Sequence, residues 1–94
     1  METPPLVART PSLADSQGLE APFDLLFVDA NDAKDDVDAS VGLLAPGGTA
    51  VLDDFWVDPA LPDLRRDAWL HHPLLTTVEL WVTSERRALI SVRR

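Results

Sequence analysis

Acidic side chains stand at the ends of two apolar runs of the chain. Asp29 ends the run 23–29, and Asp53 ends the run 49–53 with Asp54 directly after it. Ligands of open α/β sheets bind beyond the carboxyl ends of parallel strands, so these carboxylates would share one edge of a sheet. Carboxylates on neighbouring strand ends supply the oxygen ligands that Mg²⁺ or Ca²⁺ takes. The alternative is that these acids only solvate strand ends and cap helices.

The loops after these runs carry further candidates. Asn31 and Asp32 could contact a cofactor or a metal, although such residues more often form turns and helix N-caps. Phe55 and Trp56 follow the second run, where a flat ring could stack on a planar substrate. The alternative is that these two rings cover the edge of the sheet.

Two histidines, His71 and His72, stand at the end of a predicted helix. A histidine there interacts well with the negative helix end, and it could also serve as a general base. Because the sequence shows no positioned nucleophile, the catalytic residues stay unassigned.

The elements that would position these residues alternate between strand and helix. The runs 23–29 and 49–53 are apolar on both faces, which predicts parallel strands with both faces covered. Between them, a helix is predicted to begin near Asn31 and to end before Pro46. Together these segments predict a right-handed βαβ unit.

A second helix and a hairpin are predicted to complete the fold. The helix lies near 61–71, and the hairpin pairs 77–82 with 87–92. Trp69 and Trp81 lie on apolar faces of these elements and are predicted to be in the core. The order β-α-β-α-β-β therefore predicts a mixed α/β sheet that ends in an antiparallel hairpin.

The composition is that of a small acidic globular chain. It has 94 residues, a formal net charge of −8 and no cysteine, which argues against nucleic-acid binding and excludes disulfides and thiolate metal sites. No apolar run reaches the roughly 18 residues of a membrane span, and no secretory signal precedes the first strand, so a soluble, cytoplasmic protein is predicted. Residues 1–21 show no periodicity and are predicted to be a loose leader before a folded part at 22–94.

The apolar runs and the turn between them resemble a known family. The segment 23–30 (Phe-Asp-Leu-Leu-Phe-Val-Asp-Ala) and the segment 43–54 (Leu-Leu-Ala-Pro-Gly-Gly-Thr-Ala-Val-Leu-Asp-Asp) are similar to the fourth and fifth strands of class I S-adenosylmethionine-dependent methyltransferases. These two sequence motifs are most similar to those of the small O-methyltransferases and their catechol-type relatives. The hairpin would then be strands six and seven, so residues 22–94 resemble the C-terminal half of that Rossmann-like domain.

This resemblance implies S-adenosylmethionine as cofactor, Mg²⁺ or another divalent cation, and a small-molecule methyl acceptor. It places all contacts in the loops after the two runs: cofactor binding at Asp29, Ala30 and Asn31, metal binding at Asp29 and Asp54, and the acceptor pocket at Phe55 and Trp56. The family usually has asparagine after the second acid, where this chain has Phe55. One ligand of the family's metal site is therefore missing.

The family's glycine-rich cofactor loop has no counterpart in these 94 residues, because the four glycines form no G-x-G sequence. Strand 23–29 would pair with the family's first strand, so its outer edge is expected to be open and to pair with a second copy or a partner chain. Two interpretations stay open: an enzyme whose cofactor half comes from elsewhere, or a non-catalytic half-domain that acts as an assembly module or is a remnant.

Overall fold

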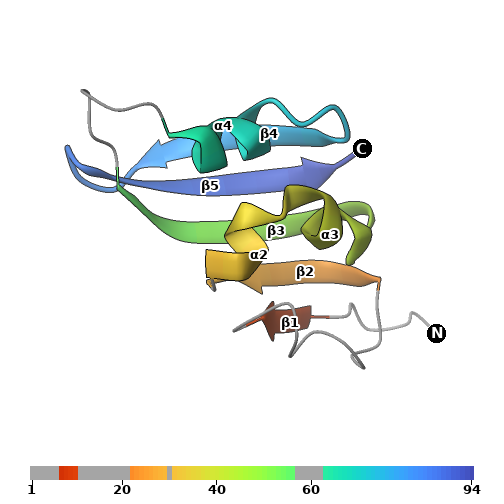
Figure 1. Ribbon diagram of the computed structural model, residues 1–94. Helices are drawn as coiled ribbons and strands as arrows, with labels where there is room; N and C mark the ends of the chain where they lie inside the picture. Colours follow the sequence, from red (N-terminus) through yellow and green to blue (C-terminus); the bar gives the residue numbers. More distant parts are fainter. Residues whose placement is uncertain (1–6, 11–21, 30, 57–62) are drawn as a thin grey trace.

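A five-stranded mixed sheet forms the centre of the computed structural model, which describes residues 7–10, 22–29, 31–56 and 63–94 but not the side chains of 7–10, 31, 32 and 54. The strand order is β1-β2-β3-β5-β4 (Figure 1). The strands span β1 Val7–Thr10, β2 Phe23–Val28, β3 Leu44–Trp56, β4 Leu75–Trp81 and β5 Arg86–Arg93. The pairs β1–β2 and β2–β3 are parallel, whereas β3–β5 and β4–β5 are antiparallel. The expected mixed α/β class is therefore confirmed.

Three short helices, α2 (Asn31–Asp35), α3 (Val37–Gly42) and α4 (Leu64–Leu70), lie on one face of this sheet (Figure 1). The single helix predicted after Asn31 is wrong, because it is broken at Asp36. The Asp36 carboxylate accepts a hydrogen bond of 3.0 Å from the Ala39 backbone N–H, so Asp36 starts a new helix instead of continuing the old one. None of the described helices is long and apolar enough to span a membrane.

The core lies between the helices and the sheet. Cross-strand rows of small and aliphatic residues face the helices, and Trp69 of α4 packs on them with no exposed surface. The indole N–H of Trp69 donates to the main-chain oxygen of Lys34 at 2.9 Å, which ties α4 to α2. The predicted core position of Trp69 is confirmed.

Trp81 is not in the core, so that prediction is wrong. Its side chain is 72% exposed at the end of β4, an edge strand of the sheet. The Arg87 guanidinium stacks on its ring at 3.7 Å. At this position the Trp81 ring is therefore in contact with the guanidinium of Arg87.

The segment predicted to be a loose leader contains a strand. Residues Val7–Thr10 form β1 and pair with β2 in the register Val7↔Leu25 to Thr10↔Val28. The outer edge of strand 23–29, expected to be open, is therefore occupied over these residues. A four-residue strand is too short for alternation to reveal in the sequence, but the unpaired backbone groups of β2 favour any extended neighbour.

Candidate functional site at the carboxyl edge of the parallel strands

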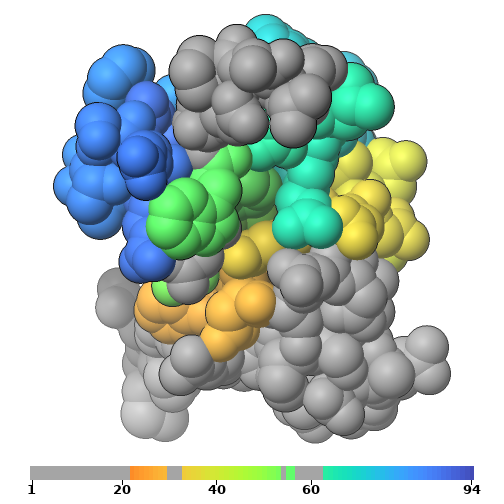
Figure 2. Space-filling view, turned by 60° about the vertical axis from the view of Figure 1, so that its left-hand side comes forward, coloured from red at the N-terminus to blue at the C-terminus, as the bar shows by residue number. Residues whose placement is uncertain are grey.

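The candidate site lies where β2 ends beside β3. Val28, the last residue of β2, is the register partner of Leu52 in the parallel strand β3, so Asp29 and Asp53, the next residues along the two strands, lie at the same edge of their ladder. Asp29 is half-buried, and the Asp53 side chain is 64% exposed. Figure 2 shows the end of β3 at the surface between the β4–β5 hairpin and β2. The structure thus brings Asp29 and Asp53 to one edge, whereas Phe55 and Trp56, which were predicted to follow the strand, are its last residues.

Lys34 of α2 is a residue at this edge that the sequence analysis did not single out. Its side chain is only 4% exposed, and its ammonium group donates to the main-chain oxygen of Asp53 at 2.6 Å. The same nitrogen lies 3.9 Å from the Asp53 carboxylate and 5.3 Å from the centre of the Phe55 ring. A buried cation therefore holds β3 at Asp53 and offsets part of the negative charge of that carboxylate.

One sequence signal points to Lys34. It is the only basic residue between Arg9 and Arg65, and it stands among the acids of the segment 29–38. A lone base in an acidic stretch is a candidate for a paired, inward position. Its burial, however, depends on how α2 folds back over β3, which the sequence does not reveal.

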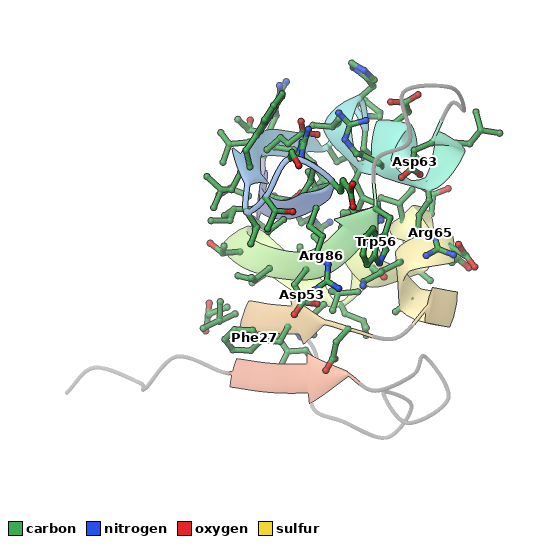
Figure 3. All side chains as sticks on the ribbon, turned by 90° about the vertical axis from the view of Figure 1, so that its left-hand side faces the viewer. Phe27, Asp53, Trp56, Asp63, Arg65 and Arg86 are labelled. Atoms are coloured by element: carbon green, nitrogen blue, oxygen red, sulfur yellow. The ribbon has the colours of Figure 1, made fainter. Side chains whose placement is uncertain are left out.

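The aromatic pair Phe55 and Trp56, at the end of β3, is divided between core and surface. The register of β3 with β5 shifts between Leu52 and Phe55. As a result Phe55 is 3% exposed beneath the helices, whereas Trp56 is 58% exposed. The Arg86 guanidinium stacks on the Trp56 ring at 4.3 Å (Figure 3). Of the two predicted pocket residues, only Trp56 therefore presents a ring to a ligand.

The described acids do not by themselves form a metal site. Within residues 22–29, 31–56 and 63–94, no three acidic or histidine side chains are placed to hold one ion. The candidate ligand Asp54 lies at this edge, but its side chain is outside the described part, as are Ala30 and the side chain of Asn31. A metal ion here would need Asp54.

His72 is engaged away from this edge. Its Nδ1 accepts the Leu74 backbone N–H at 3.1 Å, so the ring proton lies on Nε2, which donates to Asp38 of α3 at 2.7 Å. This contact joins the end of α4 to α3. The structure therefore gives His72 a bridging role, and His71 is exposed with its backbone N–H bonded to Asp67.

A second charged cluster joins α4 to the hairpin. The Arg66 guanidinium donates to the Glu79 carboxylate, and Arg87 Nε lies 3.6 Å from the other carboxylate oxygen. The hydrogen bond from Arg66 holds the pKa of Glu79 below its ordinary value of 4.5. The same bond raises the pKa of Arg66. This charge cluster stabilises the contact between α4 and the hairpin.

Two solved structures share this fold. The crystal structure of a presumed O-methyltransferase from Klebsiella pneumoniae matches with a TM-score of 0.60 and 21% identity, over 85% of this chain and 44% of that protein. The crystal structure of cofactor-bound Rv0187 from MTB matches with a TM-score of 0.54 and 22% identity, over 87% of this chain and 44% of that protein. No protein-family model and no curated protein matches the chain.

At 21% and 22% identity, these two matches show a similarity of fold. The chain has a mixed α/β, methyltransferase-like fold, and it spans less than half the length of either solved protein. The expected resemblance to methyltransferases is confirmed at this level.

Proposed function

We propose that this chain provides the acceptor side of an S-adenosylmethionine-dependent O-methyltransferase site. One observation carries the proposal: β2 and β3 run parallel and side by side, and the acids after their last paired residues, Asp29 and Asp53, lie at the same edge, in a chain whose fold is similar to that of an O-methyltransferase structure. The carboxyl edge is where ligands of such sheets bind.

Each side chain at this edge has a part in the proposed site. Trp56 offers an exposed ring for stacking on a planar, hydroxylated acceptor. The buried charge of Lys34 favours a negatively charged oxygen near the end of β3. Asp29 and Asp54 are the proposed ligands of Mg²⁺, and Asp29, Ala30 and Asn31 the proposed contacts to the cofactor. S-adenosylmethionine, when bound, supplies an already activated methyl group, so the chain's own task is to orient the acceptor.

The glycine loop of the cofactor site is assigned to polypeptide outside these residues, because no G-x-G sequence occurs in the 94. This division makes the acceptor side testable on the chain alone. It predicts that the chain binds an acceptor without binding the methyl donor tightly.

The test is calorimetric titration with catechol in the presence of Mg²⁺. We expect binding that is about tenfold weaker in Asp29→Asn, a loss of about 1.4 kcal/mol. The control is Glu85→Gln, which removes one acid from the exposed hairpin turn and should leave binding unchanged. Equal binding by both variants, or no heat with the parent chain, would contradict the acceptor-side proposal.

A parallel titration with S-adenosylmethionine tests the division of the site. The proposal expects no micromolar binding by the chain alone. Binding at that affinity would overturn the assignment of the cofactor side to another polypeptide.

The second candidate function, an assembly module without chemistry, is supported by a different observation. The sheet face opposite the helices carries exposed apolar side chains, including Phe27 at 40% and Val78 at 53% exposure.

A further inference from the structure

The sheet has a second face that none of the described helices covers. Residues paired in register point to the same side of a sheet, and neighbours along a strand point to opposite sides. The row Leu26–Ala50–Ser91 is buried under the helices. The next row must therefore point away from the helices, and it consists of Phe27, Val51, Ile90 and Val78.

This face, which we call the open face, is apolar and accessible. Its most exposed apolar members come from all four strands of the row: Phe27 40%, Trp56 58%, Val78 53%, Leu80 47% and Val92 39%. Figure 3 shows Phe27 and Asp53 on the side of the sheet away from α2. Sheets with parallel strands are normally covered on both faces, so the open face is expected to have a partner.

The size of the open face is that of an interaction site. Four strands about 4.8 Å apart, each contributing about six residues of 3.3 Å, cover roughly 400 Å². The largest apolar patch of a soluble monomer has about this size and is often functional. Two such faces in contact would bury roughly 800 Å², which is below the area of stable complexes and in the range of weak, transient ones, so a weak, concentration-dependent complex is expected.

We propose that the open face binds a second copy of this chain, with a two-fold axis that runs along the strands between β3 and β5. This axis sets β3 of one copy against β5 of the other, and β2 against β4. Val51 then faces Ile90 of the second copy, and Phe27 faces its Val78. The row is self-complementary in this arrangement. Each residue faces an apolar residue of the second copy that lies at the same distance from the axis.

The charges at the border of the open face fit the same axis. Asp53 of β3 and Arg86 of β5 carry opposite charges near the carboxyl edge, and Figure 3 shows both there. The two-fold axis sets Arg86 of one copy opposite Trp56 of the other, its register partner, and Asp53 of that strand lies between this pair and the Val51–Ile90 pair, twice. Arg86 is already stacked on Trp56 at 4.3 Å, which holds its charge at this border. The polar rim is thus complementary to itself, as a symmetric interface requires.

Sedimentation equilibrium of the 94-residue chain tests the proposal without cofactor, metal or acceptor, so its failure is separate from failure of the proposed function. We expect a monomer–dimer equilibrium whose dissociation constant rises at least about tenfold in Val78→Glu, since a charge at a buried apolar contact must be desolvated. The matched control is Leu64→Glu on α4, where an apolar side chain is 77% exposed away from this face. A monomer at every concentration, or equal weakening by both variants, would overturn the proposal and leave the face to a different polypeptide.

Cross-linking tests the axis itself and replaces the first test if Val78→Glu unfolds. The chain has no cysteine, so the double variant Phe27→Cys/Val78→Cys introduces the only two thiols. A short bismaleimide should join two chains of this variant into a covalent dimer. The double variant Phe27→Cys/Leu64→Cys should not form it. Equal cross-linking of both double variants would overturn the proposed axis.

Discussion

At the scale of single residues, the clearest coupling between charge and stability is at Glu79. Its side chain is 16% exposed, and it receives a hydrogen bond from Arg66 of α4 while Arg87 of β5 lies beside it. One carboxylate thus holds a helix against both strands of the hairpin. Its protonation state must therefore matter to folding.

Glu79→Gln should lower the free energy of unfolding at neutral pH by about 1–2 kcal/mol, because a charged hydrogen bond is lost. The pKa of Glu79 is depressed in the folded chain, so its contribution is complete above its ordinary value of 4.5 and is lost as the pH falls below it. Urea titrations across this range should show the parent chain losing stability more steeply than the variant. The exposed Glu85→Gln should keep the parent's slope, and parallel slopes for parent and Glu79→Gln would contradict the assignment.

The sequence predicts some site residues and not others for a definite reason. The acids Asp29 and Asp53 follow apolar runs, so their shared edge follows from the direction of the strands alone. The positions of Lys34, Phe55 and Trp56 depend on a helix break and on a shift of register, neither of which leaves a periodic pattern. The local sequence predicts that β2 ends near Asp29, but it does not predict which side chains pack beside that end.

At the scale of elements, the irregular first part of β3 is a tightly constrained segment. Leu44 pairs with Phe23, but the next pair is Thr49 with Leu25, so four residues of β3 lie outside the ladder. Gly47 takes a φ of 80°, which L side chains rarely adopt. Pro46, Gly47 and Gly48 predict the end of a helix, but in the structure they lie inside β3.

Gly48→Ala should destabilise the chain by about 1–3 kcal/mol, because the new methyl group would overpack a filled site. A Cβ at Gly48 would lie 2.7 Å from the Phe23 carbonyl oxygen and 2.8 Å from that of Ala45, and both are backbone atoms that cannot turn away. The control is Gly42→Ala in α3, where nothing lies within 4 Å. Thermal unfolding of the two variants compares them directly; equal melting temperatures would show that this segment can relax.

At the scale of the whole molecule, the described helices form one layer on a sheet whose other face carries exposed apolar side chains. The sequence predicts β2 and the two hairpin strands near their observed bounds, because apolar runs and turn residues are local signals. It predicts only the middle of β3, which spans Leu44–Trp56. β1 pairs with the backbone N–H and C=O groups at the edge of β2, an interaction that the side chains of residues 7–10 do not specify.

A single helix layer makes the fold depend heavily on Trp69. Its indole is fully buried and bonded to Lys34, so Trp69→Ala should cost about 3–5 kcal/mol, a large part of the stability of a chain this small. Trp81→Ala removes a ring that is 72% exposed and should cost less than about 1 kcal/mol. Circular dichroism with urea titration measures both. Similar losses for the two variants would mean that α4 does not anchor the core as its contacts indicate.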